Sequence, residues 1–489
     1  GAHRGWRGPT GSRLCLADPG SVALPATDSA APSASPTQRV SYQPTYQPGA
    51  STALLTDRYE LTMLQAALAD GTAGRHCLFE VFTRRLPPGR RYGVLAGTGR
   101  VLEALSSFRF SAAELDWLHA QSVVDDRTLE FLAGYRFTGT ITGYPEGEVF
   151  FPQSPVMTVE GTFAEAVLLE TLVLSILNYD SAVASAASRM TSAAVERPCL
   201  EMGARRAHEQ AAVAAARAAV VGGFAGTSNL EAGRRYGLET IGTAAHAFTL
   251  LHDDEKSAFA SQVASLGPGT TLLVDTYDVR RGVENAVEAA GGHLGAVRLD
   301  SGDLGVLAVE VRRQLDALGA HDTKITVTSD LDEYAIASLA AAPVDSYGVG
   351  TSLVTGSGAP TCGMVYKLVA RADSSGVLQP VAKASTAKTS TGGRKCAARR
   401  YDADGRAVEE VVVTGADLAV QEWEPDDVDL RRLQVPLVVD GAVDSRWVGS
   451  YGVENAAHRH REARAELPRG ARRLSAGDPA IPTVVHTLS

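Results

Sequence analysis

The stretch at residues 295–304 reads Gly-Ala-Val-Arg-Leu-Asp-Ser-Gly-Asp-Leu, an apolar run that passes directly into a polar turn and then into a helical pattern. The same order recurs on both sides of it. Strand-like runs lie at residues 271–275, 295–299, 324–328 and 344–349, and helical runs at 283–290, 304–318 and 332–341. Strands that alternate with helices predict βαβ units, and hence an α/β fold with a parallel sheet or barrel.

Each predicted strand ends in a polar or Gly-rich turn. The four turns lie at residues 275–278, 298–303, 328–330 and 348–352. In parallel α/β folds, ligands bind at the carboxyl ends of the strands. A single turn of this kind is explained as well by the preference of Gly and Asp for turns and helix caps. Four in succession favour a ligand site at this edge of the sheet.

The last of these turns, Gly-Val-Gly-Thr-Ser at residues 348–352, suits a phosphate group. Its glycines let backbone N–H groups approach a phosphate closely, and a hydroxyl adds a further donor. It is not a Walker A motif, because no Gly-Lys-Ser/Thr follows it. The chain also has no GxSxG elbow, HExxH motif or Rossmann fingerprint.

The turn after the second strand carries charges of both signs. Arg298 suits bidentate capture of a carboxylate or phosphate, and Asp300 and Asp303 suit ribose hydroxyls or, through water, Mg²⁺. Asp275 and Asp278 suit either role. Structural ion pairing within the loop is the alternative to a binding role.

Two further segments carry candidate binding groups. Arg205 and Arg206 are adjacent in the sequence, and neighbouring residues do not share a helix face, so we expect at most one of them to point into a pocket. His246 follows small residues that leave room for a ligand. From the residues alone, a structural role for this histidine is the stronger alternative.

Changes in composition and pattern predict four regions along the chain. The first is rich in Ala, Ser, Pro and Thr with few acids, which favours a disordered extension over a transit peptide. A β-containing domain, an α/β domain and irregular C-terminal segments follow. The expected boundaries are 1–50, 51–161, 162–360 and 361–489.

Local signals define some helices within these regions. Asp57 and Glu60 are placed to cap a helix over residues 57–70 that ends at Gly71, and Thr162 with Glu165 predicts a capping box before a long helix over 163–190. Residues 383–400 hold six cations and no acid, which indicates a solvated basic loop or, alternatively, a polyphosphate contact.

Composition excludes several classes of protein. The 489 residues carry a net charge of −10, which argues against a nucleic-acid partner. No apolar run approaches the ~20 residues of a membrane span, so no membrane partner is expected. The five cysteines form no CxxC pair, which disfavours a disulfide framework or a zinc site and favours a reducing cytoplasm.

Taken together, the motifs resemble those of the nicotinate phosphoribosyltransferase family, and they occur in the family's order. The matching stretches are residues 55–63, 201–206, 222–229, 242–246, 297–304, 329–333 and 347–351. The resemblance implies a type II phosphoribosyltransferase fold, in which an irregular, TIM-like α/β barrel packs on an α+β domain formed by the N- and C-terminal segments. It also implies a homodimer with shared active sites.

The reaction implied by the resemblance belongs to NAD salvage. Nicotinate and phosphoribosyl pyrophosphate would give nicotinate mononucleotide and pyrophosphate, with Mg²⁺ and coupled ATP hydrolysis. The relative specific for nicotinamide, and a paralogue that binds a phosphorylated ligand without catalysis, are the alternatives. Among the departures from the family pattern, Met202 stands where much of the wider family has a ring-stacking Phe.

Individual roles also follow from the resemblance, residue by residue. Tyr59 would stack on the pyridine ring from the partner subunit, while Thr243 and Arg298 would hold nicotinate. Arg205 would face substrate phosphates, and Asp300 would hold ribose hydroxyls. The 5′-phosphate would lie against Gly350 and Thr351, and ATP would phosphorylate His246.

Overall fold

The computed structural model describes residues 50–383, 391–415, 423, 425 and 427–487. The predicted extension over residues 1–50 lies outside them except for its last residue, and so does part of the basic segment. Residues from 49 onwards form one unit. Among the described residues, no helix is long and apolar enough to cross a membrane.

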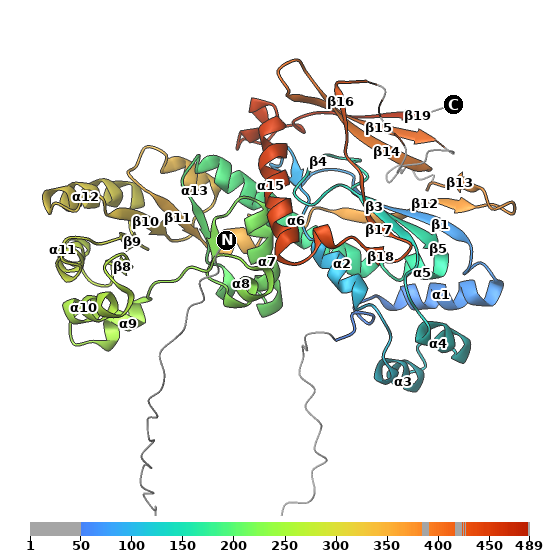
Figure 1. The fold of residues 1–489 in the computed structure, drawn as a ribbon, viewed down its shortest axis with the longest axis horizontal. Coiled ribbons are helices and arrows are strands. Elements are labelled where there is room, and N and C mark those ends of the chain that lie inside the picture. The colour runs from blue at the N-terminus through green and yellow to red at the C-terminus, as the bar shows by residue number, and fades with distance from the viewer. Residues whose placement is uncertain (1–49, 384–390, 416–422, 424, 426, 488–489) are drawn as a thin grey trace, which may run out of the picture. The chain divides into compact units, whose positions relative to one another are not determined.

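A six-stranded parallel sheet forms the α/β part of this unit. Its strand order is β7 (Gly226–Thr227), β6 (Cys199–Glu201), β11 (Ser346–Val349), β10 (Lys324–Thr328), β9 (Ala296–Leu299) and β8 (Thr271–Leu273). Helices α11 (Val279–Ala289), α12 (Leu304–Ala317) and α13 (Glu333–Ser338) connect the strands as predicted. Figure 1 shows α10 (Glu255–Leu266), α11 and α12 alongside β8 and β9. The predicted alternation of strands and helices is confirmed.

Two alanine-rich helices pack on each other next to this sheet. The predicted helix over 163–190 is two helices, α5 (Phe163–Val167) and α6 (Glu170–Ala193), while the predicted capping box of Thr162 and Glu165 is confirmed. Helix α7 (Glu209–Val221), which packs on α6, was not predicted from the sequence. At the end of α7, a Cβ on Gly222 would lie 2.5 Å from the Cβ of Ala187, so the two helices approach closely because glycine stands there.

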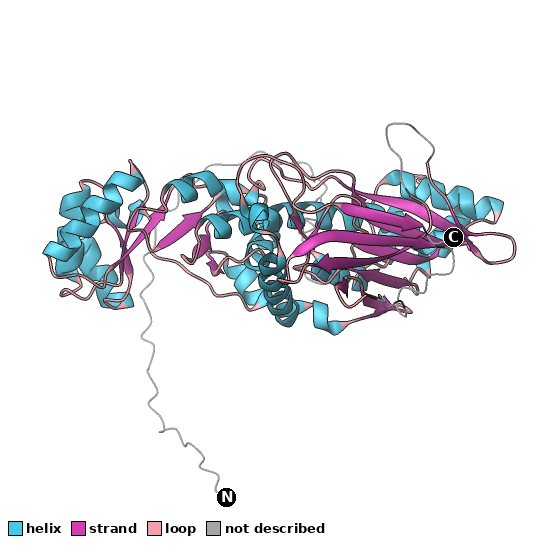
Figure 2. Cartoon of the chain, turned by 90° about the horizontal axis from the view of Figure 1, so that it is seen from above, coloured by secondary structure: helices cyan, strands magenta, loops and turns pink. Residues whose placement is uncertain are grey.

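Two further sheets lie in the rest of the unit, with their strands in magenta in Figure 2. The seven-stranded sheet is antiparallel and takes strands from early and late parts of the described chain, whereas the four-stranded sheet has one parallel pair, between its last two strands. The seven-stranded sheet runs in the order β13 (Leu378–Pro380), β12 (Met364–Ala372), β1 (His76–Thr83), β5 (Met157–Thr162), β3 (Thr140–Gly143), β17 (Val435–Val439) and β18 (Ala442–Val443). A four-stranded sheet contains β16 (Leu430–Arg432), β14 (Arg394–Tyr401), β15 (Ala407–Gly415) and β19 (Thr483–Thr487). The fold class is therefore confirmed, while the boundaries at 161/162 and 360/361 stay predictions.

The remaining elements are short. Strands β2 (Gly93–Val94) and β4 (Val149–Phe150) pair with each other. Helices α1 (Arg58–Asp70), α2 (Thr98–Ser106), α3 (Ala112–Ala120) and α4 (Asp126–Ala133) lie in the N-terminal half, and α8 (Leu230–Tyr236), α9 (His246–Leu251), α14 (Thr351–Val354) and α15 (Gly449–Glu466) lie further along the chain.

Helix α1 begins and ends as predicted, but its cap differs. Asp57 is the N-cap residue and makes no side-chain cap hydrogen bond, while Gly71 ends the helix with a φ of 83°. Glu60 instead turns inward, where its carboxylate accepts hydrogen bonds from Thr171 N (3.0 Å) and Oγ1 (2.6 Å). Burial raises the pKa of Glu60 to about 7. The predicted capping role of Glu60 is wrong because a partner distant in sequence competes for it.

Both interpretations of the basic segment 383–400 are wrong for its described cations in strand β14. Lys395 donates to Glu80 at 2.7 Å, and Arg399 donates to Glu148 at 2.6 Å and to Glu410 at 2.7 Å. Arg399 is fully buried. These side chains belong to a strand with internal ion pairs, because the carboxylates opposite them neutralise their charge.

The Arg399 network makes the fold sensitive to acid. Burial acts to raise the pKa of Glu148, but the charges of Arg399, Arg431 and Arg459 outweigh it and lower this pKa from 4.5 to about 2. A carboxylate whose pKa is lowered in the folded state stabilises the fold above its unfolded pKa. That stability is lost as the pH falls from about 4.5 to about 2.

We predict that Arg399→Ala lowers the free energy of unfolding by about 3–5 kcal/mol, because it leaves the carboxylates of Glu148 and Glu410 buried beside a lost partner. Chemical denaturation followed by circular dichroism measures the loss. Arg446→Ala, which breaks an exposed pair with Asp444, is the matched control and should cost much less. Equal losses in the two variants would contradict the structural role of Arg399.

Candidate active site

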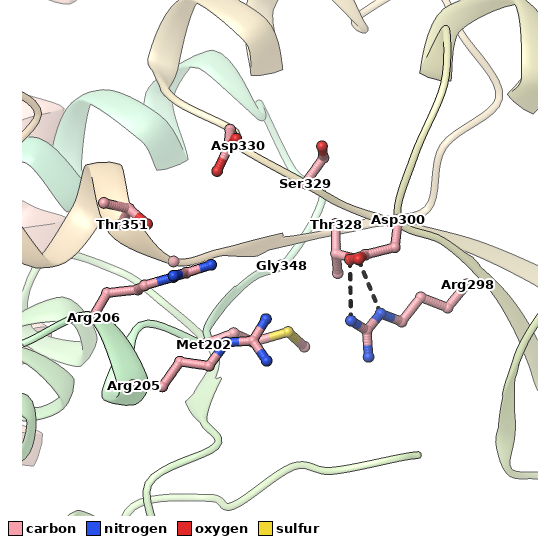
Figure 3. Close-up of a pocket in the computed structure, with 11 residues that line it drawn as sticks. Met202, Arg205, Arg206, Arg298, Asp300, Thr328, Ser329, Asp330, Gly348 and Thr351 are labelled. Atoms are coloured by element: carbon pink, nitrogen blue, oxygen red, sulfur yellow. Dashed lines mark hydrogen bonds and ion pairs between the residues drawn. The ribbon is translucent and has the colours of Figure 1, made fainter. Parts of the chain in front are cut away.

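A cavity of about 240 Å³ opens at the carboxyl ends of β6, β9, β10 and β11. Five of the eight predicted site residues are in or beside it, namely Arg205, Arg298, Asp300, Gly350 and Thr351. Figure 3 draws the lining residues as sticks and labels Arg205, Arg298, Asp300 and Thr351 among them. The full lining is Met202, Arg205, Arg206, Arg298, Asp300, Thr328, Ser329, Asp330, Gly348, Gly350 and Thr351.

A triangle of hydrogen bonds fixes the polar centre of this cavity. Arg298 Nε donates to Thr328 Oγ1 at 2.9 Å and Nη2 donates to Asp300 Oδ1 at 3.1 Å, while the Thr328 hydroxyl donates to the same carboxylate oxygen. Burial acts to raise the pKa of Asp300, but hydrogen bonds from Thr328 and then Arg298 outweigh it, so this pKa is lowered. Asp300 is therefore a carboxylate at neutral pH.

Asp275 lies behind Asp300 at the end of β8. Its Oδ2 accepts hydrogen bonds from Asp300 N at 2.9 Å and Ser301 Oγ at 2.6 Å. Its Oδ1 is buried and has no hydrogen-bond partner among the described residues, although His246 Nε2 lies 3.9 Å away. Asp275 therefore keeps one acceptor available.

The other predicted carboxylate has a structural role. Asp278 is the N-cap of α11, where its side chain accepts a hydrogen bond from Arg281 N at 2.9 Å. Within the described part of the chain, no three His, Cys, Asp or Glu side chains converge to hold a metal. A cation at this site would therefore depend on few protein oxygens.

His246 begins helix α9 near Asp275. Its Nδ1 lies 3.0 Å from Thr276 Oγ1, and its side chain is 40% exposed. The His246 ring is therefore partly open to solvent, with a hydroxyl within hydrogen-bond distance and a carboxylate oxygen nearby.

The two adjacent arginines both line the cavity (Figure 3). The expectation that at most one of Arg205 and Arg206 points into it is wrong, because they lie in a short 3₁₀ turn, Ala204–Arg206, instead of an α-helix. Neither guanidinium has an ion pair among the described residues. Two unpaired cations at the mouth of a polar cavity favour an anionic ligand.

The buried carboxylate of Glu201 anchors the start of this turn. It accepts hydrogen bonds from Gly203 N and from Thr227 Oγ1, each at 2.5 Å. Burial raises the pKa of Glu201.

The sequence placed Thr328, Ser329, Asp330 and Gly348 in turns at strand ends without an individual role for each, although the structure shows why two of these positions matter. A Cβ on Gly348 would lie 2.5 Å from Thr328 Cγ2 and 2.7 Å from Met202 Sδ, so only glycine leaves this space open. Glycine inside a strand often marks such a close approach. Ser329 has a φ of 153°, which L-residues rarely adopt, and backbone strain of this kind clusters at functional sites. Asp330 lies in a predicted turn but was given no role.

Three predicted site residues do not line the cavity, namely His246, described above, Tyr59 and Thr243. Tyr59 lies on α1 with 44% of its side chain exposed, and Thr243 is exposed in the loop before α9. Burial, followed by the charge of Glu170, raises the pKa of Tyr59 to about 12. The described cavity therefore has no aromatic side chain.

Solved structures identify the class. The crystal structure of human nicotinic acid phosphoribosyltransferase matches with a TM-score of 0.74 and 25% identity, over 88% of this chain and 97% of that one. A nicotinate-nucleotide pyrophosphorylase from Pyrococcus furiosus matches with a TM-score of 0.69 and 26% identity, over 85% and 96%. The fold is that of a type II phosphoribosyltransferase.

Sequence comparisons identify the family. A family model of the nicotinate phosphoribosyltransferase N-terminal domain matches residues 54–178. Nicotinate phosphoribosyltransferase pncB1 of Mycobacterium tuberculosis is 57% identical over 440 residues, which are 88% of this chain and 94% of the relative. The Bacillus subtilis enzyme is 39% identical over 355 residues, 71% of this chain and 72% of the relative. This chain belongs to the nicotinate phosphoribosyltransferase family.

We predict that Arg205→Ala and Arg206→Ala each weaken the binding of inorganic pyrophosphate about tenfold, because each removes a charge-assisted hydrogen bond. Titration calorimetry at constant ionic strength measures the dissociation constant. Arg446→Ala, a charge change away from the cavity lining, is the control. If only one of the two cavity variants binds more weakly, the other arginine does not contact the anion.

Proposed function

We propose that this protein is a nicotinate phosphoribosyltransferase, which forms nicotinate mononucleotide and pyrophosphate from nicotinate and phosphoribosyl pyrophosphate in NAD salvage. The observation that carries the proposal is the meeting of Arg298 and Asp300 with Arg205, Gly350 and Thr351 in one cavity. Such a site combines a cation for a carboxylate, an acceptor for ribose hydroxyls and donors for phosphates.

The proposed reaction depends more on the positions of the two substrates than on proton transfer. The pyridine nitrogen of nicotinate is itself the nucleophile, so no general base is needed. As the bond from the ribose carbon to pyrophosphate breaks, positive charge develops on the ribose. We propose that the carboxylate of Asp300, held by Arg298, binds the ribose hydroxyls and stabilises that charge.

Arg298 is our candidate for the nicotinate carboxylate. Asp300 and Thr328 occupy its Nε and Nη2 groups, while its Nη1 has no hydrogen-bond partner in the described residues. The guanidinium is therefore already oriented before a ligand arrives, which lowers the entropic cost of binding. We assign Thr243 to the same substrate by resemblance.

The phosphate groups have their own part of the site. Gly350 and Thr351 begin α14 and are proposed to bind the 5′-phosphate through backbone N–H and hydroxyl donors. Arg205 and Arg206 are proposed to bind the pyrophosphate, because these two lining cations have no ion pair with any residue that the structure describes. The leaving group is then neutralised where its charge grows.

One of the two carboxylates predicted for Mg²⁺, that of Asp275, fits the ion. Mg²⁺ keeps several waters and binds through one or two carboxylates plus substrate phosphates. Asp275 Oδ1 is a buried oxygen without a hydrogen-bond partner in the described part of the chain. Asp275 would hold the ion, through water. Asp278 does not fit, since it caps α11. When bound, Mg²⁺ would neutralise pyrophosphate charge.

ATP is proposed as a co-substrate that phosphorylates His246. An imidazole nitrogen would attack the γ-phosphorus, ADP would leave, and water would later release phosphate from the histidine. The 40% exposure of His246 and its contacts with Thr276 and Asp275 support this assignment.

A homodimer is proposed because α1 presents apolar groups to solvent. Tyr59, Met63 and Leu55 are 44%, 37% and 61% exposed. Tyr59 and Met63 lie four residues apart on α1, so they share one face of the helix, and Leu55 lies in the segment just before it. We propose that this face brings Tyr59 to the cavity of a second copy, where it would stack on the pyridine ring.

A cytoplasmic location is proposed from the thiols. Cys77, Cys199, Cys362 and Cys396 are free and buried. Such thiols persist in a reducing compartment.

A product assay with nicotinate, phosphoribosyl pyrophosphate and Mg²⁺ tests the function. We expect nicotinate mononucleotide, with nicotinate preferred over nicotinamide in competition. Arg298→Ala should raise the KM for nicotinate by one to two orders of magnitude, since a carboxylate loses its charged partner. Preference for nicotinamide would reassign the substrate, and binding without product would favour a non-catalytic relative.

We predict that His246→Ala separates ATP hydrolysis from product formation. The variant should form nicotinate mononucleotide without consuming ATP, because it has no imidazole to accept the phosphate. Parallel measurement of ADP and nicotinate mononucleotide checks this, with His458→Ala as the control at an exposed histidine. ATP use in proportion to product in His246→Ala would rule out the phosphohistidine.

A further inference from the structure

A buried carboxylate outside the cavity joins two of its loops. Glu333 is the first residue of α13 and is 1% exposed. Its Oε2 accepts a hydrogen bond from Ser357 Oγ at 2.5 Å, and its Oε1 accepts from Arg189 Nε at 3.0 Å and Arg90 Nη1 at 3.5 Å. Each oxygen therefore has a distinct set of partners.

The two loops that meet at Glu333 both line the cavity. Helix α13 follows Ser329 and Asp330, and the segment ending at Ser357 follows α14, which begins at Thr351. Ser357 N also donates to Ser352 O at 2.6 Å. Glu333 is thus three residues from Asp330 in one cavity loop. Through Ser357 it is separated from Thr351 in the other loop only by the short helix α14.

The arginines extend the same cluster to a third segment. Arg90 Nη2 donates to Gly356 O at 2.8 Å, and Arg189 Nη1 donates to Gly89 O at 2.9 Å. Both guanidinium groups are nearly buried. Glu333 is the carboxylate that both of these cations contact, so it holds the backbone of residues 89–90 and 356–357 through them.

The backbone at Ser357 is strained. Its φ is 51°, a left-handed conformation that non-glycine residues rarely adopt. Such a conformation persists only where surrounding contacts enforce it. The Ser357 hydroxyl on Glu333 is one of these contacts, so the segment after α14 keeps a conformation that its own residues do not prefer.

We propose that Glu333 is a positioning residue that, through Ser357, sets α14 against the Ser329–Asp330 loop in the geometry that binds the phosphates of phosphoribosyl pyrophosphate. This inference rests on the proposed function. Glu333 touches no substrate. It acts on the phosphate side of the cavity and leaves the contacts of Arg298 unchanged.

Ser357→Gly in the full chain is the sharpest test. Glycine accepts the left-handed backbone without strain, so the midpoint of thermal unfolding should stay within about 2 °C. The lost hydroxyl frees the segment after α14, and the dissociation constant for phosphoribosyl pyrophosphate with Mg²⁺ should rise roughly tenfold by calorimetry. The KM for nicotinate should stay within about twofold.

Two further variants separate positioning from stability. Glu333→Gln should weaken phosphoribosyl pyrophosphate binding in the same direction as Ser357→Gly. Glu80→Gln changes a buried carboxylate of strand β1 that pairs with Lys395. This variant should lower the midpoint of thermal unfolding and leave the dissociation constant for phosphoribosyl pyrophosphate unchanged. An unchanged dissociation constant in Ser357→Gly, or an equal rise in both substrate constants, would overturn the inference.

The wild-type protein distinguishes this inference from the proposed function. If it binds phosphoribosyl pyrophosphate but makes no nicotinate mononucleotide, the proposed function fails, and the comparison of dissociation constants still decides the role of Glu333. If it does not bind phosphoribosyl pyrophosphate at all, both are overturned.

Discussion

The parallel pairing of β9 with β10 is the constraint on which the candidate site depends. The register sets Arg298 opposite Thr326 and Leu299 opposite Val327, so Thr328 comes beside the turn that carries Asp300. One carboxylate can then accept from both a guanidinium and a hydroxyl. Because these bonds lower its pKa, Asp300 stays charged, and that charge keeps Arg298 aimed.

Buried ion pairs connect the parts of the fold around the site. In the turn between β3 and β4, Glu146 accepts from Arg217 on α7, and Glu148 accepts from Arg399 on β14. Gly147 separates them with a φ of 92°. Removal of one partner would leave an unpaired buried charge, which costs several kcal/mol. These pairs therefore hold the α/β part and the C-terminal strands to a single short turn.

Local patterns predicted the parts of the molecule that local physics decides. The βα alternation and the loops at the strand ends follow from short-range periodicity, and they located Arg298 and Asp300 correctly. Arg399 was misjudged because its carboxylate partners are distant in sequence. Helix α7 went unnoticed because it is buried nearly all round and has little amphipathic contrast. The expectation that only one of Arg205 and Arg206 points into the cavity assumed an α-helix, in which neighbouring side chains do not share a face. Both residues lie instead in a 3₁₀ turn.

The cavity of one chain is better suited to phosphate and ribose than to an aromatic ring. Most of its side chains are charged or hydroxyl-bearing, and Met202 supplies the one apolar side chain in its described lining. An aromatic ring binds favourably where its faces meet apolar or aromatic side chains. Tyr59 lies exposed on α1, outside this lining. The ring-binding half of the site therefore calls for a second surface, and this is the physical reason to connect the proposed dimer with the proposed substrate.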